Sequence, residues 1–199
     1  MMPAKIRHFS QSVLSAEAWF CTADELIAAM ELVGRNVERF WHDCGSILSG
    51  FDATSGTHTK PKESDVSQKP GDDAQAKHNL INQHMMLAGF AIENLCKGHL
   101  VPLLDPQEKE AIKAGRLPNK LANHHIADLA RSTGITLSER EQDLLDRIEI
   151  AVIWRGRYPS PRSYEKISPF IQWEDDVKRI ETFLPRLRAQ VGAEPVPKS

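Results

Sequence analysis

The amino-acid sequence predicts an all-α fold, an up-and-down helical bundle of four main helices with short helices between them. Apolar residues recur every three or four positions through several long segments, as they do in helices that bury one face. No segment stands out for the alternation of apolar and polar residues that is typical of strands. A chain of 199 residues is long enough to form one domain with a substantial core.

Two long helices are expected in the first half of the chain. The first runs from Ser12 to about Cys44, either as one helix or as two joined near Gly34. The second runs from about Ala76 to Leu100, and its apolar face comprises Ile81, Met85, Leu87, Ala88, Phe90, Ala91, Ile92 and Leu95. A face this wide predicts a central helix that several other helices contact.

Two short helices are expected next. Pro106 marks the first turn of one of them, because proline is favoured at that position. The other runs from His124 to Ser132, and Gly134 ends it.

Two longer helices complete the predicted bundle. Ser138 and Glu141 match a capping box, which predicts the start of a buried helix that continues to Ile153. The last helix spans Trp173 to Leu187, with Pro185 as a kink or an early end.

The domain organisation follows from these elements and from one change in composition. Residues 1–51 form an N-terminal helical segment of the bundle, and residues 76–191 form its helical core. Between them, residues 52–75 have almost nothing apolar to bury, so we expect a flexible polar insertion there. Residues 192–199 are expected to be a disordered tail.

The composition argues against several classes of protein. The formal net charge is −2, so binding to nucleic acid has to be local. The cysteines Cys21, Cys44 and Cys96 are odd in number and widely spaced, which argues against a disulfide framework or a structural zinc site. We find neither a signal peptide nor an apolar run long enough to span a membrane, and we expect a cytoplasmic protein.

The segment that follows the helix ending near Ile153 is the sharpest candidate for a binding site. Arg155, Arg157 and Arg162 lie there with Tyr158, and Pro159 and Pro161 stiffen the chain around them. From Trp154 to Ser168, four cations against one acid give a local net charge of +3. Guanidinium groups suit phosphates and carboxylates, and a tyrosine ring can stack on a base. Structural pairing of these arginines with acidic groups on a neighbouring helix is the alternative.

Charged residues on the predicted central helix form a second candidate group. Glu93 and Lys97 are spaced to pair, and we expect them to face a cleft or a partner, with Glu93 bound to an arginine such as Arg157. His124 and His125 are candidates for capping a helix or for acid–base chemistry. The sequence lacks the common phosphate-loop, dinucleotide, hydrolase and histidine metal-site motifs, and predicts neither a metal nor a cofactor.

Three stretches of the chain, taken together and in order, resemble the HEPN family, the nucleotide-binding helical domains of higher eukaryotes and prokaryotes. They are Leu87–Leu100, which looks like the family's central helix, His124–Leu129, which looks like its histidine-led short helix, and Arg157–Pro159, which looks like its arginine–tyrosine–proline motif. The resemblance covers residues 76–187 and implies a helical bundle that is often a homodimer. Many members are RNA-cutting toxins or defence effectors that use an Arg-x(4–6)-His motif. That motif is absent here, because no histidine follows Arg155, Arg157 or Arg162.

We therefore expect a non-catalytic HEPN-like protein that binds a nucleotide, RNA or a protein partner and forms a homodimer. The ligand-binding residues would be Glu93, Lys97, His125, Arg155, Arg157, Tyr158 and Arg162. Two alternatives stay open. One is a divergent ribonuclease of a defence or toxin–antitoxin system, with His124 or His125 as the acid–base group. The other is a pure interaction protein that dimerises through apolar faces around Trp41 or Trp173.

Overall fold

The computed structural model describes the backbone of residues 4–48, 70–155 and 176–193, and the side chains of 4–36, 80–153 and 176–193. These ranges are almost entirely helical and contain no strand. The prediction of an all-α helical bundle is therefore confirmed. Most of the predicted polar insertion and most of the basic segment after Ile153 lie outside the described residues.

The described chain begins with a short helix that the sequence pattern did not predict. α1 (Ala4–Leu14) is followed by Ser15, whose hydroxyl accepts a hydrogen bond from the backbone N–H of Ala18 at 3.2 Å. This bond caps the start of α2 (Ala16–Leu48). α2 continues without a break through Gly34, so the first long segment is one helix rather than two.

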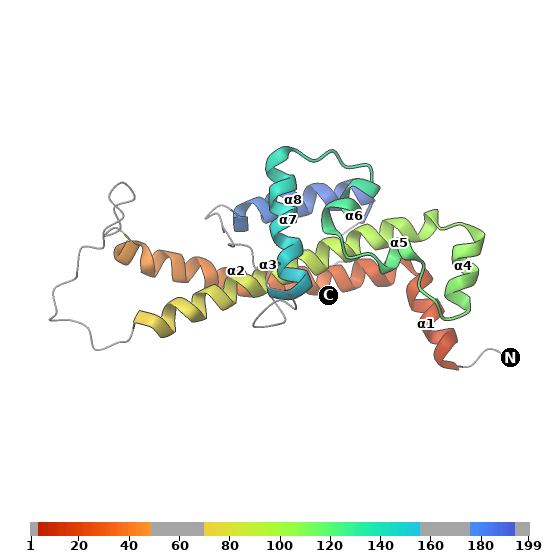
Figure 1. Ribbon diagram of the computed structural model, residues 1–199, viewed down its shortest axis with the longest axis horizontal. Helices are drawn as coiled ribbons and strands as arrows, with labels where there is room; N and C mark the ends of the chain where they lie inside the picture. The colour runs from red at the N-terminus through yellow and green to blue at the C-terminus, as the bar shows by residue number, and fades with distance from the viewer. Residues whose placement is uncertain (1–3, 49–69, 156–175, 194–199) are drawn as a thin grey trace.

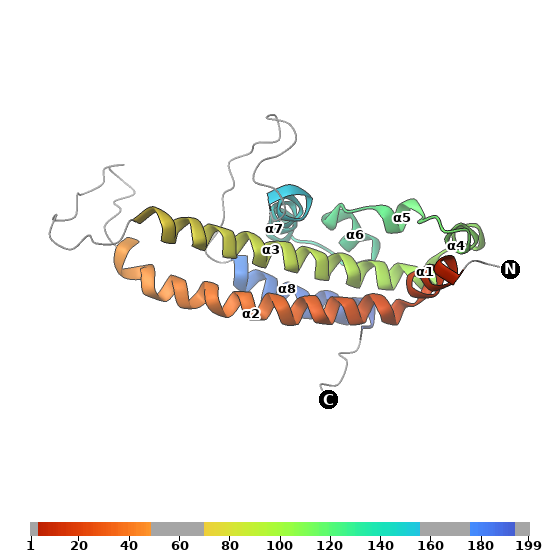
Figure 2. The same cartoon turned by 90° about the horizontal axis from the view of Figure 1, so that it is seen from below.

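α3 (Pro70–Leu100) is the central helix, as the width of its apolar face predicted. It runs antiparallel to α2, and the two form a long hairpin (Figures 1 and 2). Their close approach depends on Gly98, because a Cβ atom there would lie 2.5 Å from the Phe20 ring. α3 begins at Pro70 rather than near Ala76, so the last part of the predicted polar insertion is helical.

Short helical elements follow at the end of this hairpin. A 3-10 turn (Val101–Leu103) leads into α4 (Pro106–Lys113), in which Pro106 occupies the first turn as predicted. Asp105 and Glu108 form a capping box at its start, which adds to the signal from Pro106. The single turn of α5 (Asn119–Ala122) comes next.

α6 (Ile126–Ser132) starts later than predicted. His125 is its N-cap residue and His124 precedes it, so neither histidine lies within the helix. Gly134 follows the helix with a φ angle of +83°, which confirms that a glycine ends it.

α7 (Glu139–Ile150) begins with the predicted capping box between Ser138 and Glu141. At its end the chain continues as a π-helical turn (Ala151–Arg155). This region packs directly on α3 at Gly89, where a Cβ atom would lie 2.2 Å from Cγ2 of Val152. In Figure 1 α7 crosses α3 steeply, and its C-terminal end lies closest to α3.

α8 (Asp176–Val191) is the last described helix. It continues through Pro185, so the helix does not end early at that residue. It contacts both α3 and α7, and with them it encloses the apolar core. The largest fully buried side chains include Met85, Ile92 and Leu95 of α3, Leu144, Leu145 and Ile148 of α7, and Ile180, Phe183 and Leu187 of α8.

Candidate functional site

A buried ion pair lies at the centre of the candidate site. Lys97 Nζ donates to Glu93 Oε1 at 2.6 Å, and the two residues are only 2% and 6% exposed. The two residues are one helical turn apart on α3, so the helix itself sets their spacing. The Lys97 ammonium also lies 5.8 Å from the centre of the Trp19 ring of α2. The pair therefore faces the interior of the protein and α2, whereas the sequence predicted that it would face a cleft or a partner.

His124 completes this cluster from the segment before α6. Its Nδ1 atom lies 3.0 Å from both carboxylate oxygens of Glu93. A carboxylate only accepts hydrogen bonds, so Nδ1 carries the proton and donates it to Glu93. The second ring nitrogen, Nε2, lies on the opposite side of the ring, and the His124 side chain is 59% exposed.

His125 repeats this arrangement on another carboxylate. Its Nδ1 atom lies 3.0 Å from Glu149 Oε1, near the end of α7, while Glu149 Oε2 accepts the backbone N–H of Ile126 at 2.9 Å. The hydrogen bond to Glu149 raises the pKa of His125 above its ordinary value, and the charge of Glu149 adds to this effect. The His125 side chain is 63% exposed.

His124 and His125, here called the histidine pair, therefore join the start of α6 to α3 and to α7. Glu93 binds one of them to α3, and Glu149 binds the other to α7. Among the described residues, neither Nε2 atom has a hydrogen-bond partner. Each ring thus has one nitrogen held by a carboxylate and one that binds no other residue in the described part of the chain.

Cys96 lies beside this cluster on α3 and is fully buried. Burial raises the pKa of its thiol far above the ordinary value, and the charge of Glu93 contributes. A buried thiol with a raised pKa is a poor nucleophile. Cys96 therefore serves as a small apolar residue in the core.

The structure brings together some of the predicted site residues and leaves others apart. Glu93 and Lys97 are paired, but the histidine that contacts Glu93 is His124, whereas His125 binds Glu149. Glu149 was not among the predicted residues. Of the predicted arginines and tyrosine, Arg155 has only its backbone described, at the end of the π-helical turn, and Arg157, Tyr158 and Arg162 lie outside the described residues. The predicted pairing of Arg157 with Glu93 lies outside them as well.

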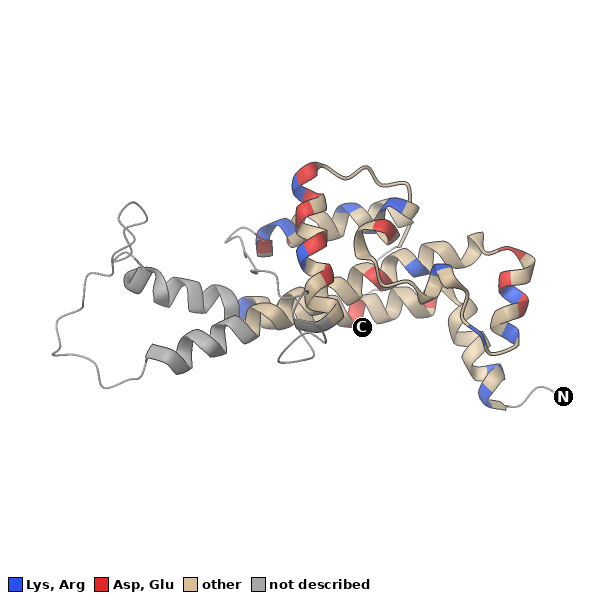
Figure 3. Ribbon diagram, viewed as in Figure 1, with Lys and Arg blue, Asp and Glu red and all other residues tan. Residues whose placement is uncertain are grey.

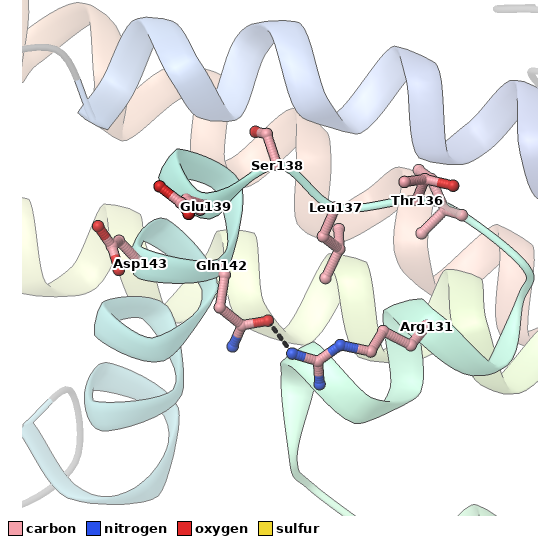
Figure 4. Close-up of a pocket in the computed structure, with 8 residues that line it drawn as sticks. Arg131, Thr136, Leu137, Ser138, Glu139, Gln142 and Asp143 are labelled. Atoms are coloured by element: carbon pink, nitrogen blue, oxygen red, sulfur yellow. Dashed lines mark hydrogen bonds between the residues drawn. The ribbon is translucent and has the colours of Figure 1, made fainter.

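An open depression of about 610 Å³ lies near the turn between α6 and α7. Figure 4 shows Arg131 reaching from α6 to the side-chain oxygen of Gln142 on α7. Arg131 also pairs with Asp128 at 2.9 Å, so its guanidinium group already has acceptors. With Glu139 and Asp143 also lining it, this depression is poorly suited to an anion.

The described part of the chain contains neither a metal site nor a helix that could span a membrane. No group of three or more histidine, cysteine, aspartate or glutamate side chains there is arranged to hold a metal ion. None of its helices is both long and apolar enough to cross a membrane.

Comparisons with protein-family models, curated proteins and solved structures find nothing that matches this chain.

Proposed function

We propose that this protein is a non-catalytic HEPN-like helical bundle that binds a phosphate-bearing ligand, a nucleotide or RNA, and works as a homodimer in the cytoplasm. The observation that carries the proposal is the histidine pair, whose Nδ1 atoms bind Glu93 and Glu149 and whose side chains are 59% and 63% exposed. An imidazole whose Nδ1–H is held by a carboxylate donates from Nε2 to a phosphate oxygen in its protonated form, which the raised pKa of His125 favours.

The position of Glu149 supports this proposal. It lies near the end of α7, and Arg155 follows it at the end of the π-helical turn. The basic segment with Arg157, Tyr158 and Arg162 therefore starts within two helical turns of the carboxylate that holds His125. The short sequence distance from Glu149, which holds His125, to three arginines favours an anionic ligand.

The buried ion pair has a supporting role in this proposal. Lys97 supplies the opposite charge that a buried Glu93 needs, and the same carboxylate binds His124. Glu93 and Lys97 would thus position the site rather than contact the ligand. Their place on the central helix fits the pattern on which the resemblance to the HEPN family rests.

Thermal stabilisation by a panel of nucleotides and short RNAs tests this proposal. A ligand present at 100 times its Kd is expected to stabilise the wild type by about 2.7 kcal/mol. The stabilisation should vanish in His125→Ala and in Arg157→Ala. His8→Ala is the matched control, because His8 is an exposed histidine on α1. No stabilisation of the wild type by any nucleotide or RNA would overturn the proposal and favour a pure interaction protein.

A divergent ribonuclease is the second candidate, and the same histidines favour it. A histidine whose Nδ1 is held by a carboxylate keeps Nε2 free to take or give a proton. In RNA cleavage, one histidine would remove the proton of the 2′-hydroxyl and the other would protonate the leaving 5′-oxygen. The products would be a 2′,3′-cyclic phosphate and a 5′-hydroxyl end. Cleavage by the wild type that is lost in His124→Ala or His125→Ala would favour this candidate over a binding protein.

A further inference from the structure

The carboxylates that hold the histidine pair determine what each ring offers to a ligand. Nδ1 of His124 lies 3.0 Å from Glu93, and Nδ1 of His125 lies 3.0 Å from Glu149, so both Nδ1 atoms carry a proton. A neutral ring has only that proton, and its Nε2 atom is then a hydrogen-bond acceptor. Nε2 becomes a donor when the ring takes up a second proton. Ionised phosphate oxygens only accept hydrogen bonds, so they bind the protonated ring and not the neutral one.

The net charge around the histidine pair changes sign with the same two protons. In the described part of the chain, the charged groups that the pair faces are Glu93 with Lys97 on α3, Glu149 on α7, and Asp128 with Arg131 on α6. Figure 3 shows acidic positions on all three helices near the start of α6. Three carboxylates against two cations give a net charge of −1 while both rings are neutral, and two added protons raise it to +1. The neutral pair therefore repels an anion, and the protonated pair attracts one.

The fold favours the second proton on His125. The hydrogen bond to Glu149 raises the pKa of His125, the charges of Glu149 and Asp128 add to this effect, and together they outweigh burial. Cys96 is the other titratable group beside Glu93, and burial raises the pKa of its thiol far above the ordinary value. The thiol therefore stays neutral where histidines titrate, and protons taken up at this site go to the rings.

We infer that the histidine pair is a proton-gated anion site, which binds the phosphate group of the ligand with both rings protonated and releases it when they lose these protons. The inference rests on the proposed function and adds the regulation of its site. The gate consists of the polarity of the two Nε2 atoms and the sign of the local charge, so it requires no movement of the backbone. Binding takes up protons, and by linkage it weakens as the pH rises.

The test measures proton uptake on binding, by isothermal titration calorimetry in buffers of different ionisation enthalpy between about pH 6 and about pH 8.5. The probes are a dinucleotide and a single-stranded RNA of about ten nucleotides. Their internal phosphodiester groups keep one negative charge each over this range, so a change in affinity reports on the protein. Well above the ordinary histidine pKa of about 6.5, uptake should approach about two protons for each contacted phosphate group. The affinity should then fall by up to about 100-fold for each pH unit.

Glutamine variants assign these protons to the histidine pair. The amide N–H of glutamine donates at every pH, so His125→Gln should lower the uptake by about one proton and the pH dependence to about 10-fold for each unit. His8→Gln is the matched control, because it removes an exposed histidine of α1 and should leave the uptake unchanged. Glu149→Gln keeps both histidines but removes the main cause of the raised pKa of His125, so the pH dependence should move to lower pH. Circular dichroism at each pH checks that every variant is folded.

The possible outcomes separate the inference from the proposed function. Binding to the wild type with the same affinity at every pH, and without proton uptake, would overturn the inference and leave the proposed function standing. Equal proton uptake by the wild type and by folded His125→Gln would place the titrating groups elsewhere and overturn the inference as well. A wild type that binds neither probe at any pH would overturn the proposed function, and the inference with it.

Discussion

Arg147 and Asp176 join the middle of α7 to the first residue of α8 through two hydrogen bonds, Nη2 to Oδ1 at 2.7 Å and Nε to Oδ2 at 2.9 Å. Asp176 is completely buried, and the Arg147 side chain is only 13% exposed. Arg147 precedes the segment 156–175 and Asp176 follows it, so this bidentate ion pair holds the start of α8 against α7.

Substitution of Asp176 by asparagine should destabilise the fold strongly. Asparagine keeps the size of the side chain but leaves Arg147 without its counter-charge, a loss that costs about 3 kcal/mol for a buried pair. Urea denaturation measures the change. Asp128→Asn is the control, because its pair with Arg131 is largely exposed and should contribute less than about 1 kcal/mol. Equal costs in the two variants would contradict a structural role for the buried pair.

The buried pair of Glu93 and Lys97 should show strong non-additivity. Lys97→Met leaves Glu93 buried with His124 as its remaining partner, and should cost about 3 kcal/mol in urea denaturation. The double variant with Glu93→Gln should recover most of this loss, because no buried charge is left unpaired. A double variant as unstable as Lys97→Met would show that Lys97 acts through packing, for example on Trp19.

His125 should titrate above its ordinary pKa only while Glu149 is ionised. In an NMR titration, Glu149→Gln should return the pKa of His125 towards 6.5, whereas Asp128→Asn, which removes a weaker influence, should lower it less. Because the folded pKa is raised, the stabilisation by this contact is complete below pH 6.5 and is lost as the pH rises through the folded value. An unchanged His125 pKa in Glu149→Gln would contradict the contact.

Gly89→Ala should destabilise the packing of α7 on α3. The new Cβ atom would lie 2.2 Å from Cγ2 of Val152 and 2.8 Å from Cγ2 of Ile148, and overpacking of this kind costs about 1–3 kcal/mol. Alanine also favours a helix over glycine by up to about 1 kcal/mol, so the net loss is a lower bound on the clash. Adding Val152→Ala should restore part of the stability in thermal denaturation. A Gly89→Ala protein as stable as the wild type would show that α7 shifts freely.

Local signals in the sequence predicted three of the helix ends correctly. The capping box of Ser138 and Glu141, the proline at position 106 and the glycine at position 134 act within one turn, so their effect is visible without knowledge of the fold. α1 was not predicted because few of its residues are buried, namely Ser10 and Val13. A helix that buries so few residues shows little apolar periodicity in its sequence.

The candidate site could be predicted only in part, because its contacts join distant positions. Glu93 and Lys97 are one turn apart, and their pairing followed from helix geometry. The contact of His124 with Glu93 spans 31 positions, and no local pattern indicates it. His124 precedes α6 rather than lying within it, as the predicted helix from His124 to Ser132 had placed it. Tertiary packing, rather than periodicity, selects the histidine that binds Glu93.

The π-helical turn at Ala151–Arg155 determines how the deletion of one residue would change the end of α7. A π turn contains one residue more than the α-helical turn that it replaces. Deletion of one residue from this turn should therefore convert it to regular α-helix and leave α7 and its contacts before Ile150 in place. The residues of the turn beyond the deletion would then lie about 100° around the helix axis from their present direction. Loss of the single codon for Ile153, which follows the buried Val152, would thus re-aim the end of the turn at Arg155 while the contact of Val152 with Gly89 stays in place.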